Sequence, residues 1–286
     1  MEIRRKGLLA ALAVGAGLLA GTALAQSLSS ADIKAIVASP ERSAADRTND
    51  QRRHPEEMLA FIGVKPGLIA LDLSAGGGYT TELLARSIGP TGKVYGQSRP
   101  RPATPAPTPA APEGSANPSA TPSAAAPPPP GAPRPSPVAL ADRENKLKAA
   151  NVAAAPIVAI VQPFEEPIPA ELANGKLDLV TLMFNYHDLG FLNVDRAAMN
   201  TAVFKALKPG GLYVLADHSG RAGTGISESG TLHRVEEAFL RKEVEAAGFK
   251  LAAEGTFLRN PNDPRDQNTP YPPQPKDKFV LKFVKP

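Results

Sequence analysis

The sequence predicts an α/β protein with a doubly wound, mostly parallel sheet. Three observations support this fold class. Apolar runs typical of buried strands alternate with segments that have the apolar spacing of helices. Three consecutive glycines directly follow the first of these runs. Two further apolar runs come after a long helical pattern, which indicates a closing hairpin with an antiparallel last strand.

The chain order of the expected elements is regular. The apolar runs predict strands over residues 68–74, 92–97, 155–164, 177–185 and 210–219. Between them, helical spacing predicts helices over residues 79–89, 139–151 and 194–211. The last third predicts a long helix over residues 231–249, then strands over 249–259 and 278–286. In an open sheet of this kind, ligands bind beyond the carboxyl ends of the strands.

The first 66 residues predict a leader and a helical cap. Residues 1–25 join a basic start, MEIRRK, to an apolar run and end in Ala23-Leu24-Ala25, which is typical of a cleavable signal peptide. A membrane anchor is the alternative, but the run is shorter than the roughly 20 strongly apolar residues that a spanning helix needs. We therefore expect an exported, periplasmic protein that is not inserted in the membrane after cleavage. Residues 26–66 predict helices that cap the sheet.

A second unusual segment interrupts the domain expected over residues 67–286. Residues 98–137 hold about half of the chain's 31 prolines and no aliphatic side chain larger than alanine. Such a composition buries too little apolar surface to offset the entropy of ordering, so a disordered loop insert is expected. The chain has no cysteine, which excludes disulfides. The net charge is +4 without a visible basic stripe, so no nucleic-acid partner is expected.

The glycine cluster lies in the segment LDLSAGGGYTTELL, residues 71–84. Glycines between a strand and a helix let backbone N–H groups approach a ligand closely. The dinucleotide fingerprint does not fit, because Thr81 occupies the place of its last glycine, and no P-loop lysine follows. The pattern that fits is an acidic residue at the strand end followed by the glycines.

Six segments together resemble the class I S-adenosylmethionine-dependent methyltransferases, and more closely a group of exported, predicted methyltransferases of bacteria. These segments are LDLSAGGGYTTELLA, GPTGKVYGQ, FNYHDL, ALKPGGLYVLADHS, TLHRVEEAFLRKEVEAAGF and KFVLKFVKP. The resemblance implies the seven-stranded, Rossmann-like methyltransferase fold. It also implies S-adenosylmethionine as cofactor and methyl transfer to a small-molecule acceptor. The identity of the acceptor and the oligomeric state do not follow from the sequence.

The resemblance also implies where the cofactor lies. Its methionine and ribose part would be framed by the first strand end and the loop, namely Asp72, Ser74, Gly76, Gly77 and Gly78. Its adenine would lie near Phe164 and Glu165, and Asn185 would close the site from the fourth strand. The family usually has an acidic residue at the end of the second strand to bind the ribose hydroxyls. Here the place falls on Gln97 or Ser98, and a neutral side chain loses the charge-assisted part of that bond.

The chemistry is expected at the end of the fourth strand. Tyr186 would offer a π face to the sulfonium, His187 would act as a base, and Asp188 would orient it. The equal alternative is a strand-to-helix turn with a structural histidine. A metal site built from His187, His218, His233 and a carboxylate is a minor alternative, since no compact ligand motif is present. We therefore predict no metal ligand.

Three functions remain open at this stage. The intact glycine loop favours a methyltransferase, because each glycine costs backbone entropy that packing alone does not require. The neutral Gln97 and Ser98 favour a periplasmic ligand-binding or accessory protein that keeps the fold without methyl transfer. A metal-dependent hydrolase depends only on the number of histidines. Fold-level analogy alone is a weak basis for choosing between them.

Overall fold

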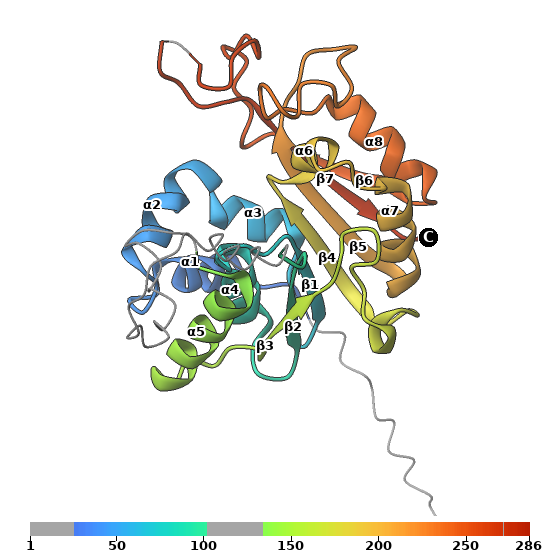
Figure 1. Cartoon of the computed structure of the whole chain (residues 1–286). Coiled ribbons are helices and arrows are strands. Elements are labelled where there is room, and N and C mark those ends of the chain that lie inside the picture. Colours follow the sequence, from blue (N-terminus) through green and yellow to red (C-terminus); the bar gives the residue numbers. More distant parts are fainter. Residues whose placement is uncertain (1–25, 102–133, 271) are drawn as a thin grey trace, which may run out of the picture.

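The computed structural model describes residues 26–101, 134–270 and 272–286 (Figure 1). Within these residues seven strands form one sheet in the order β3-β2-β1-β4-β5-β7-β6. The strands are β1 (Ile69–Leu73), β2 (Lys93–Ser98), β3 (Ile157–Val161), β4 (Leu177–Met183), β5 (Leu207–His218), β6 (Lys250–Gly255) and β7 (Lys278–Val284). The strand β7 pairs antiparallel with both β5 and β6, while the other pairs are parallel. The predicted fold class is confirmed.

Helices cover both faces of the sheet (Figure 1). The helices on one face are α1 (Ser30–Ala38), α3 (Pro55–Ile62), α4 (Tyr79–Ile88) and α5 (Ser136–Ala149), with α2 (Ala44–Arg53) beside them. The other face carries α6 (Tyr186–Phe191), α7 (Arg196–Ala206) and α8 (Glu237–Ala246). A short 3₁₀ helix, Ala170–Leu172, precedes β4. This arrangement buries both faces, as a mostly parallel sheet requires.

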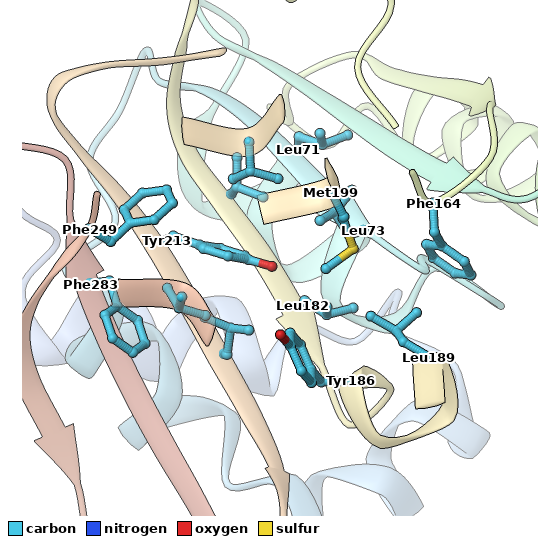
Figure 2. Packing of buried hydrophobic residues seen from close by; sticks show 14 of the residues in the cluster. Leu71, Leu73, Phe164, Leu182, Tyr186, Leu189, Met199, Tyr213, Phe249 and Phe283 are labelled. Carbon is cyan, nitrogen blue, oxygen red and sulfur yellow. The ribbon is translucent and has the colours of Figure 1, made fainter. Parts of the chain in front are cut away.

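The larger core lies between the sheet and α6 to α8 (Figure 2). Leu71 and Leu73 of β1 point into it, and so does Met199 of α7. Tyr213 and Phe249 add an aromatic contact, with ring centroids 5.4 Å apart. Side chains alternate between faces along a strand, so Ala70 and Asp72 face the opposite layer from Leu71 and Leu73. The fully buried β1 places the loop that follows it at the middle of the sheet edge.

The sheet order fixes where a ligand can bind. The neighbours β1 and β4 lie at the centre, and the chain winds outward from β1 through β2 to β3 and from β4 through β5. The carboxyl ends of β1 and β4 therefore meet at the topological switch point, where open α/β sheets bind ligands. The glycine loop and the segment beginning at Asn185 both start there.

The start of α8 and the end of α7 differ from the sequence-based expectation. The helix α8 begins at Glu237, not at Thr231. Before it, Val235 forms an isolated parallel bridge with Ser219 just after β5, so this stretch is not helical. His233 and Glu237 therefore do not share a helical face. The helix α7 ends at Ala206, because the residue before Pro209 is disfavoured in helical conformation.

Regular structure extends into both ends of the expected insert, residues 98–137, so the insert is shorter than predicted. Ser98 is the last residue of β2, and α5 begins at Ser136. The remaining insert residues 102–133 and the expected signal peptide, residues 1–25, lie outside the described residues. In the part of the chain that the structure describes, no helix combines the length and apolarity needed to cross a membrane.

Candidate functional site

A cavity of about 1320 Å³ opens at the carboxyl ends of the central strands. Among the residues expected at the site, six line it: Ser74, Gly76, Gly77, Phe164, Asn185 and Asp188. The structure thus brings together the loop after β1, the segment after β3 and the segment after β4. The binding roles of these residues stay predictions. Apolar side chains at the same cavity, among them Val161 and Phe191, give it a mixed polar and apolar wall.

The loop after β1 has the backbone geometry of a ligand-binding turn. Ser74, Gly76 and Gly78 all have positive φ, at 55°, 53° and 79°. Such a conformation is costly for serine, which indicates that the surrounding contacts enforce it. Gly77 has no positive φ, and a Cβ added there would meet nothing within 4 Å among the described residues. The loop therefore presents bare backbone to the cavity at Gly76 and Gly77.

Gly78 has a different role from its neighbours. It caps the start of α4 and does not line the cavity as the described residues form it. A Cβ at this position would lie 2.7 Å from Leu140 Cδ2 and 2.8 Å from Arg143 Cδ. The third glycine is thus required by the close packing of α5 on the loop.

The expected ribose contact of Gln97 is corrected by the structure. Its side chain is fully buried, with Oε1 accepting from Ser74 N at 3.0 Å and Nε2 donating to Gln162 O at 2.7 Å. Because both ends of the amide are already bound, Gln97 joins the glycine loop to the end of β3. Ser98, the next residue, does line the cavity.

Asp72 is also directed away from the described wall of the cavity. Its two carboxylate oxygens accept from Thr81 Oγ1 at 2.7 Å and from Thr181 Oγ1 at 2.8 Å. Burial raises the pKa of Asp72 to about 6, although both hydroxyl bonds oppose that shift. Asp72 therefore connects β1, α4 and β4 behind the loop, and its expected direct cofactor contact is not what the structure shows.

Arg143 of α5 connects the helical cap to the glycine loop. Its guanidinium binds both oxygens of Asp46 in α2, at 2.8 and 2.9 Å, and also Glu82 of α4. Its Nε donates to Gly77 O at 2.5 Å. Burial disfavours ionisation of Asp46, but the bonds from Arg143 outweigh it and lower the pKa of Asp46. No local sequence pattern indicates this contact, because the partners are about 60 to 100 positions apart.

The segment after β4 places His187 between two carboxylates. Its Nδ1 lies 2.6 Å from Oδ1 of the fully buried Asp217, and its Nε2 lies 3.2 Å from Asp188 Oδ1. Burial disfavours the imidazolium, but Asp217 and Asp188 outweigh it and raise the pKa of His187 to about 9. Both ring nitrogens of His187 thus face carboxylates, and its expected role as a base stays a prediction.

Asp188 and His233 complete this group at the cavity wall. Asn185 Nδ2 donates to Asp188 Oδ2 at 2.6 Å, and His233 Nδ1 lies 3.3 Å from Asp188 Oδ1. Asp188 therefore orients two histidines. His218 is not one of the three residues whose ligand atoms converge here, although its ring centroid lies 5.6 Å from that of His187. His233 lies in the segment before α8, and the tertiary fold brings it to this group. No local spacing in the sequence predicts its contact with Asp188.

Two other expected site residues lie elsewhere. Tyr186 is fully buried in the core beneath α6, and its hydroxyl contacts Glu243 at 2.7 Å and Asn200 at 3.2 Å (Figure 2). It cannot offer a π face to a ligand in the cavity, so the expected catalytic role is wrong. Glu165 follows Phe164 but is not among the described residues that line the cavity.

The fold of this chain is shared with several solved structures. No protein-family model and no curated protein sequence matches the chain. It is similar to a SAM-dependent methyltransferase from Aquifex aeolicus, with 15% identity and a TM-score of 0.52 over 91% of this chain and 100% of that chain. It is also similar to the PH0226 protein from Pyrococcus horikoshii OT3, with 12% identity and a TM-score of 0.51 over 86% and 94% of the two chains.

A third similarity concerns a protein with a different activity. The cyclase SpnF has 14% identity and a TM-score of 0.50, over 87% of this chain and 86% of that chain. At these identities the similarities establish the Rossmann-like methyltransferase fold. They do not by themselves identify the chemistry, since one fold supports several activities.

Proposed function

We propose that this protein transfers a methyl group from S-adenosylmethionine to a small-molecule acceptor bound in the cavity. The observation that carries the proposal is the loop after β1, where Gly76 and Gly77 expose backbone to a cavity at the topological switch point. The fold shared with a SAM-dependent methyltransferase supports the same reading.

The cofactor would occupy the side of the cavity formed by β1, β2 and β3. Ser74, Gly76 and Gly77 would contact its methionine and ribose, and the ring of Phe164 would lie against the adenine. The acceptor would then lie toward Asn185 and Asp188 at the end of β4. Catalysis there would depend mainly on holding the acceptor in line with the methyl group, because the candidate base His187 is flanked by carboxylates.

A second candidate function is ligand binding without methyl transfer. It is favoured by the end of β2, where Gln97 is fully engaged and Ser98 is the remaining candidate partner for the ribose. The similarity to the cyclase SpnF supports the idea that this fold is not restricted to one reaction. The ligand in this case would still contact the glycine loop.

Export is a further part of the proposal. Residues 1–25 support it by their basic start, apolar run and small-residue ending. A periplasmic location would separate the protein from a donor that is made in the cytoplasm. The enzyme would then act before export or receive the donor by another route.

Binding of the donor tests the proposal. We expect S-adenosylmethionine and S-adenosylhomocysteine to bind the full-length protein with micromolar affinity in calorimetric titration. Gly77→Val should weaken both by more than about tenfold, because it adds volume where the described residues leave open space and Gly77 has no strained φ. Thermal unfolding should change little.

The control is Ala246→Val, which adds volume at an exposed position of α8. It should leave binding unchanged. Equal binding in wild type and Gly77→Val would contradict the placement of the cofactor. Absence of binding up to millimolar concentration in folded wild type would favour the second candidate function.

A further inference from the structure

Two histidines and one aspartate converge at the wall of the cavity. Oδ1 of Asp188 lies 3.2 Å from Nε2 of His187 and 3.3 Å from Nδ1 of His233. All three atoms lie within 4.8 Å of one another. Asp188 and His233 also line the cavity, and their side chains are 30% and 44% exposed. The group is therefore accessible from the side where a ligand would enter.

The spacing of these atoms matches a coordination sphere. A tetrahedral ion with bonds of about 2.0–2.1 Å to nitrogen and oxygen has neighbouring ligand atoms about 3.3 Å apart. The two separations from Oδ1 of Asp188 agree with this value. Three protein ligands with an open fourth position are also the usual composition of a catalytic zinc site.

The atoms that would not bind the ion are held by other groups. Asp217 is fully buried and contacts Nδ1 of His187 at 2.6 Å, so Nε2 is directed toward the group. Asn185 donates to Oδ2 of Asp188 at 2.6 Å, which leaves Oδ1 for the group. A carboxylate behind a ligating histidine is the common outer shell of metal sites, because it fixes the tautomer and the orientation of the ring.

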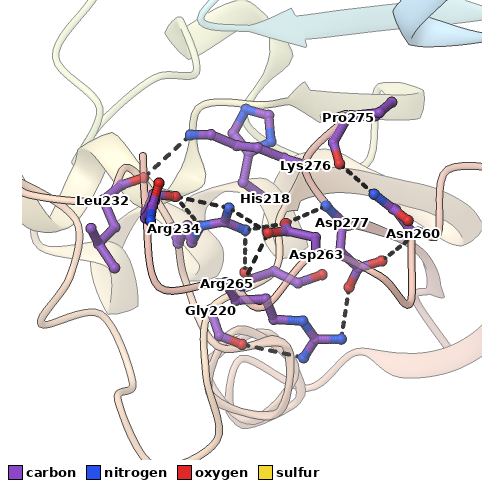
Figure 3. Close-up of polar contacts among 12 residues, drawn as sticks. His218, Gly220, Leu232, Arg234, Asn260, Asp263, Arg265, Pro275, Lys276 and Asp277 are labelled. Carbon is purple, nitrogen blue, oxygen red and sulfur yellow. Dashed lines mark hydrogen bonds and ion pairs between the residues drawn. The ribbon is translucent and has the colours of Figure 1, made fainter. Parts of the chain in front are cut away.

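The backbone of His233 is fixed in an uncommon conformation. Its φ is 51°, in the left-handed region that residues other than glycine rarely adopt. The next residue, Arg234, is fully buried and binds Asp263 at 2.8 Å and Ser219 O at 3.0 Å (Figure 3). Strain of this type persists where surrounding contacts enforce it, often at functional sites. Here the buried ion pair of Arg234 holds His233 facing Asp188.

We infer that His187, Asp188 and His233 bind one divalent transition-metal ion of the zinc type at the cavity wall. Imidazole nitrogens suit zinc, cobalt or nickel, whereas magnesium and calcium prefer oxygen ligands throughout. The remaining coordination position faces the cavity, where water or a donor atom of a small molecule completes the sphere. This assignment does not depend on binding of the methyl donor.

Metal titration of the tag-free, full-length protein tests the inference. After treatment with a chelator and removal of the chelator, Zn²⁺ should bind with one-to-one stoichiometry in calorimetry. Co²⁺ should compete and give a visible absorption band, while Mg²⁺ should bind much more weakly. His233→Asn should reduce the Zn²⁺ affinity by more than about tenfold. Asparagine tolerates the left-handed backbone, so the variant keeps the fold.

The matched control is His54→Asn. His54 also has a positive φ, 46°, and its side chain is 41% exposed, but it lies at the junction of α2 and α3. This variant should bind Zn²⁺ as wild type does. No Zn²⁺ binding by folded wild type would overturn the inference and leave a hydrogen-bonded group. Equal affinity in wild type and His233→Asn, or equal affinity for Mg²⁺ and Zn²⁺, would overturn it as well.

Discussion

At the scale of single residues, Gln97 shows how a neutral side chain can support a binding loop without touching the ligand. Its amide donates to Gln162 O and accepts from Ser74 N, and it is fully buried. An amide is suited to this position because it supplies one donor and one acceptor. A carboxylate would supply two acceptors and would face the carbonyl of Gln162.

Gln97→Glu should therefore destabilise the protein and should not tighten cofactor binding. We expect the free energy of unfolding to fall by about 1–3 kcal/mol, because a buried donor is lost and a carbonyl is left without its partner. Chemical denaturation measures the change. The control is Gln162→Glu, since only the backbone carbonyl of Gln162 takes part in the bond. Unchanged stability together with tighter cofactor binding would restore the ribose contact of Gln97.

Asp72 should give the stability a pH dependence. Burial raises its pKa to about 6 from the ordinary value of 3.8, so the folded state holds the proton more tightly than the unfolded chain. The stability from this group is present at low pH and is lost as the pH rises through about 6. Asp72→Asn removes this titration. Relative to wild type, the variant should gain roughly 3 kcal/mol between about pH 4 and pH 7.

Denaturation curves of both proteins over this pH range measure the effect. The hydroxyls of Thr81 and Thr181 can donate to the amide oxygen or accept from its nitrogen, so asparagine fits the site. Parallel stability curves for wild type and Asp72→Asn would show that Asp72 keeps an ordinary pKa.

At the scale of elements, the cap and the glycine loop are connected through α5. Arg143 binds Asp46 in α2, Glu82 in α4 and Gly77 O in the loop, and its side chain is 17% exposed. The helix α5 follows the segment 102–133 directly in the chain. A change in α5 would therefore be transmitted to the cap and to the loop together.

Arg143→Gln should destabilise the protein by about 2–3 kcal/mol, because Asp46 and Glu82 would each lose an ion pair in a largely buried position while Glu82 keeps its pair with Arg86. Hydrogen exchange of the amides from Gly76 to Tyr79 should become faster. Arg134→Gln is the matched control at the same cavity, since Arg134 is 65% exposed and its ion pair with Asp142 should contribute less than about 1 kcal/mol. Equal effects of the two variants would contradict the role of Arg143.

The sequence predicted the strands better than the site, for a physical reason. Buried strands have a local signature in their apolar runs, and the runs ending at Ser74 and at Asn185 correctly indicated the central edge. The start of α8 was missed because Val235 pairs with Ser219, a tertiary contact that overrides the helical spacing of Thr231–Glu236. Tyr186 was misplaced because neighbouring residues of a helix point in different directions. Tyr186 points into the core, whereas Asn185 and Asp188 line the cavity.

The convergence of His187, Asp188 and His233 had no local signal either. Asp188 and His233 are 45 positions apart, and the non-helical segment before α8 brings them together. The sequence groups His187 and His233 only in a minor alternative, together with His218 and an unnamed carboxylate, because no compact ligand motif joins them. Side chains that meet through tertiary structure need the fold before their chemistry can be inferred.

At the scale of the whole molecule, the proposed methyl-donor site rests on the sheet order together with the glycine loop. The fold is shared with a methyltransferase and also with a cyclase, so the fold alone does not select the reaction. What this chain adds is an open Gly76–Gly77 backbone on one side of the cavity and a histidine–aspartate group on the other. The two sides suit a donor and an acceptor that meet between them.

A crystal structure of the protein with S-adenosylhomocysteine tests the central claim most directly. The account predicts ligand density along Gly76 and Gly77, with the adenine against Phe164 and the sulfur directed toward the end of β4. The side chains of Gln97 and Asp72 should keep their present partners. A ligand bound away from the glycine loop, or an empty cavity at saturating ligand, would contradict the methyltransferase assignment.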